Sequence, residues 1–129
     1  MGSFLLSAEA VFSAAHTLPG VDMCERMHGH NWRVQATVRV PEGDLGATGM
    51  GVDFRALEQM VERAVSDFEH RYLNDLPAFT DGPPSAERLA RVVCHRLIAA
   101  LRSVAPAATV TEVALWEMPH YRVIYRPDA

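Results

Sequence analysis

The chain has 129 residues and a formal net charge of −4, with 49% hydrophobic and 22% charged residues. These values are typical of a single globular domain over residues 1–129; they exclude a largely disordered chain and argue against a basic nucleic-acid binder. All 12 basic residues are arginine, which excludes mechanisms that use a Schiff-base lysine or a P-loop lysine.

The sequence also bears on the compartment of the protein. No stretch reaches the roughly 20 consecutive apolar residues that a membrane helix needs, and Met1–Leu6 lacks the features of a signal peptide. We therefore expect a cytoplasmic protein that does not bind membranes. In that setting Cys24 and Cys94 are expected to be free thiols, because a chain of this size needs no disulfide.

The first third of the chain predicts two strands. An extended segment from Phe4 to His16 would place Phe12, Ala14 and its terminal histidine on one face, because side chains alternate along a strand. From Arg33 to Val40, apolar and polar residues alternate strictly, which is typical of a half-buried strand. The glycine-rich stretch 42–51 then predicts a turn or loop.

The middle of the chain predicts two helices joined by a loop. Asp53 is a predicted N-cap for a helix over Phe54–His70, in which apolar residues recur three and four apart. The stretch 77–84 begins and ends with proline and predicts the loop. Ser85 is predicted to cap a second helix that ends near Val104.

Two further extended segments are predicted, from Thr109 to Glu117 and from Tyr121 to Arg126. The element order is therefore β-β-α-α-β-β. This order predicts an α+β fold, in which an antiparallel sheet carries two helices on one face.

The segment around His28 and His30 is the most informative for chemistry. Two histidines that are two apart on an extended chain point to the same side, so both imidazoles can reach one ion. His16, at the end of the neighbouring strand, is the natural third ligand. Three protein ligands and an open position are the arrangement of a catalytic zinc site, and Gly29 between the ligands allows close backbone approach.

A non-enzymatic interpretation of the same residues is also open. The three histidines and Cys24 would form a closed, structural zinc site in an assembly protein. Removal of the metal would then unfold the chain.

Six short motifs follow one another along the chain. They are Phe12-Ser-Ala-Ala-His16, Cys24-x-x-x-His28-Gly-His30-Asn-Trp32, Val52-Asp53-Phe54, His70-x-Tyr-Leu-Asn-Asp75, Pro84-Ser-Ala-Glu87 and Glu117. The first two, with their spacing, are the most specific. Together they resemble the 6-pyruvoyl/6-carboxytetrahydropterin synthase family over nearly the whole chain.

The resemblance implies a tunnelling fold, whose subunits join their sheets into a barrel. It implies a homohexamer, a dimer of trimers, with active sites between subunits, and a lyase that acts on 7,8-dihydroneopterin triphosphate. Zn2+ would be held by the three histidines, and Cys24 would be the general base. His70 and Glu69 would belong to a proton relay, and Glu117 would anchor the pterin ring through its N–H groups.

The sequence departs from the family pattern at two places. Glu69 stands where the family usually has an aspartate, and the extra methylene moves the carboxylate by roughly one bond length. Met118 and Pro119 follow Glu117, where a small hydroxyl residue is common in the family. These departures concern the proton relay and the pterin pocket.

Three reactions in the family start from this substrate. One yields 6-carboxytetrahydropterin, on the route to queuosine-type deazapurines, with loss of acetaldehyde and triphosphate; the second yields the 6-pyruvoyl product. The third cleaves the side chain to 6-hydroxymethyldihydropterin for folate, and relatives with that activity tend to carry a glutamate at the position of Glu25. Because Cys24 and Glu25 are both present, the third reaction stays open, but the short chain and compact loop favour the 6-carboxy product.

Overall fold

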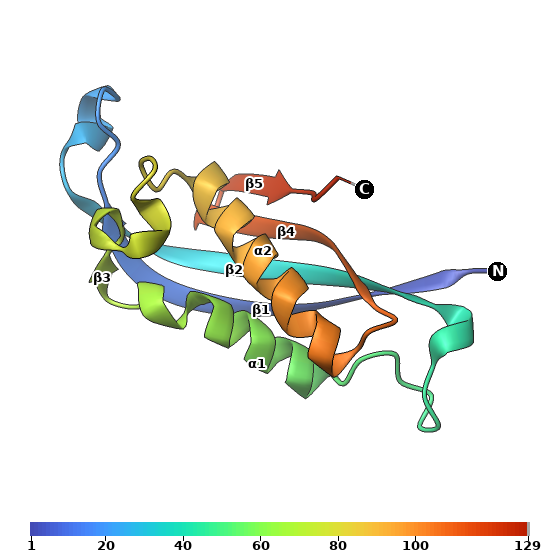
Figure 1. Ribbon diagram of the computed structural model, residues 1–129. Coiled ribbons are helices and arrows are strands. Elements are labelled where there is room, and N and C mark those ends of the chain that lie inside the picture. Colours follow the sequence, from blue (N-terminus) through green and yellow to red (C-terminus); the bar gives the residue numbers. More distant parts are fainter. Residues whose placement is uncertain (129) are drawn as a thin grey trace.

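The computed structural model describes residues 1–128 as one five-stranded sheet with both long helices on one face (Figure 1). The strand order is β3-β1-β2-β4-β5. The bounds are β1 Ser3–His16, β2 His28–Pro41, α1 Phe54–Val65, β3 Arg71–Tyr72, α2 Ala86–Val104, β4 Thr109–Met118 and β5 Tyr121–Tyr125. The α+β prediction is confirmed.

The sheet is built around a long antiparallel hairpin of β1 and β2. Its register runs from Ser3 opposite Pro41 to His16 opposite His28, with no break between. The second strand therefore starts five residues earlier than its alternating pattern predicted. Phe12 and Trp32 face each other in this register, and their rings stack at 6.0 Å on the buried side of the sheet.

The helices bury the apolar stripes that the sequence predicted. Asp53 accepts a hydrogen bond from the backbone N–H of Arg55, and Ser85 accepts one from Arg88, so both predicted N-caps are confirmed. The core between helices and sheet includes Leu57, Met60, Val61, Ala64, Val65, Phe68, Leu89, Val93, Leu97 and Leu101.

The predicted end of the first helix is wrong. The α-helix stops at Val65, and a 3-10 turn over Ser66–Phe68 follows instead of a continuation to His70. The backbone then pairs with β1: the N–H of His70 donates to the carbonyl of Ser13 at 2.6 Å. This tertiary pairing outweighs the local preference for helix, because the chain must leave the helix to run alongside β1.

A short strand that the sequence pattern did not predict follows this turn. β3 pairs in parallel with β1, with Ala14 opposite Arg71 and Ala15 opposite Tyr72. The four long strands are antiparallel as predicted, and β3 adds one parallel neighbour at the edge. Two residues are too few to show a period in the sequence.

Two further findings concern residues 1–128. No helix there is long and apolar enough to cross a membrane. Both cysteines are free thiols in the described part of the chain. Cys94 lies in the core, where burial raises the pKa of its thiol to about 11.

The cap of α1 gives a direct test of this description. Asp53→Ala should lower the free energy of unfolding by about 1 kcal/mol, because the N–H of Arg55 loses its acceptor. Asp53→Asn is the matched control, since asparagine caps about as well as aspartate. Urea unfolding followed by circular dichroism measures both; equal losses in the two variants would contradict the capping role.

Candidate metal centre

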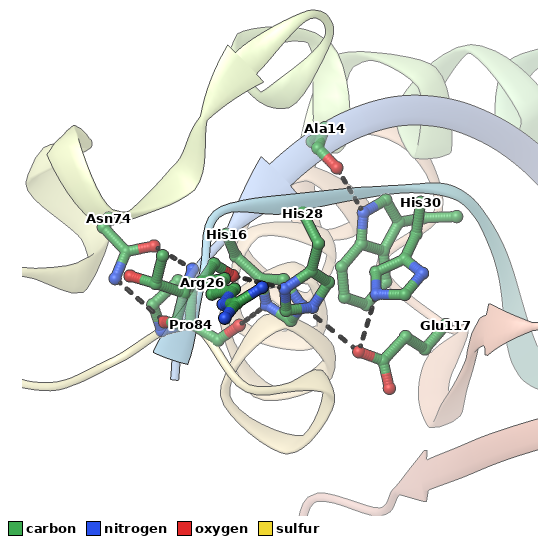
Figure 2. A network of polar contacts seen from close by, with 10 residues as sticks. Ala14, His16, Arg26, His28, His30, Asn74, Pro84 and Glu117 are labelled. Carbon is green, nitrogen blue, oxygen red and sulfur yellow. Dashed lines mark hydrogen bonds and ion pairs between the residues drawn. The ribbon is translucent and has the colours of Figure 1, made fainter. Parts of the chain in front are cut away.

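Three histidines and one glutamate converge at one end of the sheet (Figure 2). His16 ends β1, His28 and His30 begin β2, and Glu117 lies near the end of β4. One potential ligand atom from each of the four side chains lies within 4.8 Å of the other three. The structure thus brings together the three histidines that the sequence singled out, and it adds Glu117 to them.

The hairpin register explains why the histidines meet. His16 is opposite His28, and Ala14 is opposite His30, so all three imidazoles leave the sheet on the face that the helices cover. The Trp32 ring lies beside them, with its centroid 5.1 Å from that of His16 and 5.2 Å from that of His30. Its indole N–H donates to the carbonyl of Ala14 at 3.2 Å, which fixes this wall of the site.

Backbone carbonyls fix the tautomers of two of the histidines. Nδ1 of His16 lies 2.8 Å from the carbonyl oxygen of Pro84, and Nδ1 of His28 lies 2.8 Å from that of Arg26. Because a carbonyl only accepts, both Nδ1 atoms carry the proton and donate it. Nε2 of each ring then presents a lone pair, which is the form that ligates a metal.

The glutamate gives this arrangement its charge. Oε1 of Glu117 lies 3.2 Å from Nε2 of His16 and 3.1 Å from Nε2 of His30. Within residues 1–128 neither nitrogen has a hydrogen-bond partner, although both are buried. In the tautomer set by Pro84, Nε2 of His16 and the carboxylate oxygen are both acceptors, and a cation held between them would stabilise this arrangement.

Burial favours the neutral form of His16 and His30. It is the largest cause that lowers the pKa of His16 and of His30 from the ordinary value of 6.5, and it outweighs the opposite effect of Glu117. Neutral imidazole and carboxylate are donors that suit Zn2+ and related divalent ions. The donor set therefore fits a divalent cation.

Cys24 and Glu25 lie in the connection between β1 and β2. They belong to a 3-10 turn over Asp22–Glu25, where Cys24 is half-buried. Among the described residues, the fourth side chain that joins the three histidines is Glu117 and not Cys24. Oε1 of Glu25 accepts a hydrogen bond from the N–H of Gly20 at 3.1 Å, so this carboxylate also closes its own loop.

Glu69 and His70 form a pair at the outer edge of β1. Nε2 of His70 lies 3.1 Å from Oε1 of Glu69, which also accepts from the N–H of Ser13 at 3.3 Å. The His70 side chain is 81% exposed, and its backbone has a φ of +56°. Such a backbone is uncommon for a residue with a Cβ and is found where the surroundings impose it, as the bond to Ser13 does here.

An open cavity lies between His70 of this pair and His30 of the histidine cluster. It has a volume of about 500 Å3, and both His30 and the segment His70–Tyr72 line it. This size is within the range of small-molecule sites.

Sequence reasoning missed the groups that orient the imidazoles. The carbonyls of Pro84 and Arg26 belong to the backbone, so no residue type in the sequence predicts their role. The only signal was the position of Pro84 directly before a capped helix, at the same end of the sheet as His16.

Chelator-treated protein should become less stable as the pH falls. Because the pKa values of His16 and His30 are lowered on folding, the unfolded chain binds these protons more readily than the folded chain. The contribution of these two histidines to the free energy of unfolding is therefore complete above about pH 6.5, which is their pKa in the unfolded chain. It declines as the pH falls below that value.

Urea midpoints between about pH 8 and about pH 5 measure this loss. His16→Asn should weaken the pH dependence, while His95→Asn, at an exposed position of α2, should not. A midpoint that stays constant on acidification of the unaltered chain would contradict the argument from burial.

The comparisons with known proteins agree on the family. Residues 5–128 match the family described as 6-pyruvoyl tetrahydropterin synthase. The 6-carboxy-5,6,7,8-tetrahydropterin synthase of Bacillus subtilis (strain 168) is 30% identical over 131 residues, which cover 97% of this chain and 86% of that protein. A relative from Archaeoglobus fulgidus is 35% identical over 71 residues, which cover 55% of this chain and 59% of that protein.

Comparison of the structure with solved structures identifies the fold. The structure of Caenorhabditis elegans 6-pyruvoyl tetrahydropterin synthase superposes with a TM-score of 0.81 at 23% identity, and the match covers 99% of this chain and 98% of that one. The sheet with two helices described above is therefore the tunnelling fold. The chain belongs to the 6-pyruvoyl tetrahydropterin synthase family and is an enzyme of the lyase type.

Proposed function

We propose that the protein is a zinc-dependent lyase that converts 7,8-dihydroneopterin triphosphate to 6-carboxy-5,6,7,8-tetrahydropterin. The reaction takes up one water and releases acetaldehyde and triphosphate. The observation that carries the proposal is the convergence of three imidazoles beside a carboxylate, two of them with Nε2 lone pairs set by backbone carbonyls. The name of the Bacillus subtilis relative favours the 6-carboxy product over the alternatives.

In this proposal the residues of the chain have distinct tasks. His16, His28 and His30 hold Zn2+, which when bound lowers the pKa of substrate hydroxyls and polarises an adjacent carbonyl. Cys24, as a thiolate, takes a proton from the substrate side chain. These tasks require the open coordination position of a catalytic site, which a closed shell with Cys24 as a ligand would lack.

The remaining tasks concern orientation and proton transfer. Glu117 accepts N–H bonds from the pterin ring, since a carboxylate pairs well with two adjacent donors. Glu69 and His70, which are already paired at 3.1 Å, pass protons at the edge of the cavity. The longer Glu69 side chain takes the place of the usual aspartate.

Assembly and location belong to the same proposal. We expect a homohexamer in the cytoplasm, with active sites between subunits and no nucleic-acid partner. The outer edge of β1 supports assembly, because β3 covers it only at Ala14 and Ala15 and an uncovered strand edge favours pairing. Light scattering measures the mass; a monomer at working concentration would count against the subunit interface.

Metal content and product identity test the proposal together. The purified or reconstituted chain should bind a single zinc ion, and mass spectrometry should identify 6-carboxytetrahydropterin. His16→Ala should lose most of the metal because one ligand is absent, whereas His95→Ala should retain it. A chain that neither contains nor takes up a divalent metal refutes the proposal.

Variants of two neighbouring residues separate the competing reactions. Cys24→Ala should keep the metal and lose at least about 100-fold in kcat, as expected for loss of a general base. Glu25→Gln, which retains an oxygen for the N–H of Gly20, should stay close to the unaltered enzyme.

The reverse pattern, with 6-hydroxymethyldihydropterin as product, would favour side-chain cleavage. Loss of metal and unfolding of Cys24→Ala would instead favour the non-enzymatic zinc-binding assembly protein.

A further inference from the structure

The motif that runs from His70 to Asp75 contains a residue that the proposed reaction does not use. Asn74 is half-buried in the 3-10 turn Leu73–Asp75, directly after β3. Its Oδ1 accepts from the backbone N–H of Thr17 at 2.9 Å, and its Nδ2 donates to the backbone carbonyl of Thr17 at 3.0 Å (Figure 2). The side-chain amide thus bonds to both backbone groups of one residue, as a neighbouring strand would.

The position of Thr17 makes this contact relevant to the active site. Thr17 directly follows His16, the histidine that is 0% exposed in the cluster. The next residue, Leu18, donates its N–H to the carbonyl of Cys24 at 2.7 Å, and Cys24 donates its own N–H to the carbonyl of Val21 at 2.7 Å. Thr17 is therefore linked to the backbone of Cys24 through one residue, Leu18, whose N–H bonds to the carbonyl of Cys24.

The loop that carries Cys24 has few other attachments. Within residues 1–128, the hydrogen bonds of residues 18–25 stay within residues 18–26, as in the bond from Gly20 to Glu25. Val21, Met23 and Met27 are exposed, so burial of apolar surface contributes little to its place. The loop is held to the body of the protein chiefly at its two ends.

A second contact reaches Thr17 from the same segment. The hydroxyl groups of Thr17 and Tyr72 lie 2.7 Å apart. This bond involves only the threonine side chain, whereas Asn74 bonds the backbone. The two contacts can therefore be removed separately.

We propose that Asn74 is a positioning residue, which holds the backbone of Thr17 so that Cys24 keeps a fixed place relative to His16. The proposal rests on the role of Cys24 in the proposed function. It requires the amide specifically: an aspartate at this position would keep an acceptor for the N–H of Thr17 but would place an anionic oxygen against its carbonyl.

Asn74→Asp is the main test, with Thr17→Val as the matched control that loses the hydroxyl bond and keeps the backbone contact. Hydrogen exchange at the amides of Leu18 and Cys24 should become at least about 10-fold faster in Asn74→Asp, because their hydrogen bonds open more often. The amides of α2 should be unchanged. In Thr17→Val all these rates should stay near those of the unaltered protein.

Steady-state kinetics with 7,8-dihydroneopterin triphosphate provide the second readout. Asn74→Asp should lower kcat by about 10- to 100-fold with little change in KM, since a displaced base affects the chemical step and not the binding of the pterin. Asn74→Ala, which removes both hydrogen bonds without adding a charge, is measured in case Asn74→Asp does not fold, and it should lower kcat in the same direction.

The outcomes separate this inference from the proposed function. Unchanged exchange at Leu18 and Cys24 in Asn74→Asp would overturn the positioning role, and so would equal losses of kcat in Asn74→Asp and Thr17→Val. If the unaltered protein forms no pterin product, the proposed function fails, while the exchange experiment still decides whether Asn74 holds the loop.

Discussion

The register of β1 against β2 is the constraint on which the rest of the site depends. In this hairpin His16 is opposite His28, and two residues further along Ala14 is opposite His30. A slip of one residue would turn the side chains of one strand to the other face and would separate the imidazoles. The register is fixed by burial, because the same faces carry Phe12 and Trp32 into the core.

The buried face then imposes its own chemistry on the histidines. The buried imidazole of His16 needs a partner for its N–H, which the carbonyl of Pro84 supplies, and the half-buried His28 donates to the carbonyl of Arg26. Once those bonds form, the second nitrogen of each ring has no proton to offer. The carboxylate of Glu117, which lies beside Nε2 of His16 and His30, favours the binding of a cation at this end of the sheet.

Much of this arrangement was predictable from local patterns, and the exceptions share a cause. Alternation identified β2 over residues 33–40, and three- and four-residue spacing identified α2 with its Ser85 cap. The end of α1 and the presence of β3 were not predictable, because pairing with Ser13 and Ala14 determines them and these residues are far away in sequence. The two histidines of β2 were identified by their spacing.

The position of Glu117 beside the histidines depends on how β4 lies in the sheet. β4 pairs with β2, and the register shifts at its far end between Trp116 and Met118, where it pairs with β5. Such an irregularity leaves no periodic trace in the sequence, but it changes where a side chain points. The resemblance assigned Glu117 to the pterin, and only the folded sheet places it against His16 and His30.

The four side chains of the cluster come from three adjacent strands, β1, β2 and β4. An ion held by the three histidines would act as a link between β1 and β2 at that end of the sheet, next to the carboxylate of Glu117. The opposite end of the same hairpin leads into the glycine-rich stretch 42–51 and has no comparable link among the described residues. Loss of the ion would therefore loosen the sheet unequally, beginning at the end where the pterin chemistry is proposed to occur.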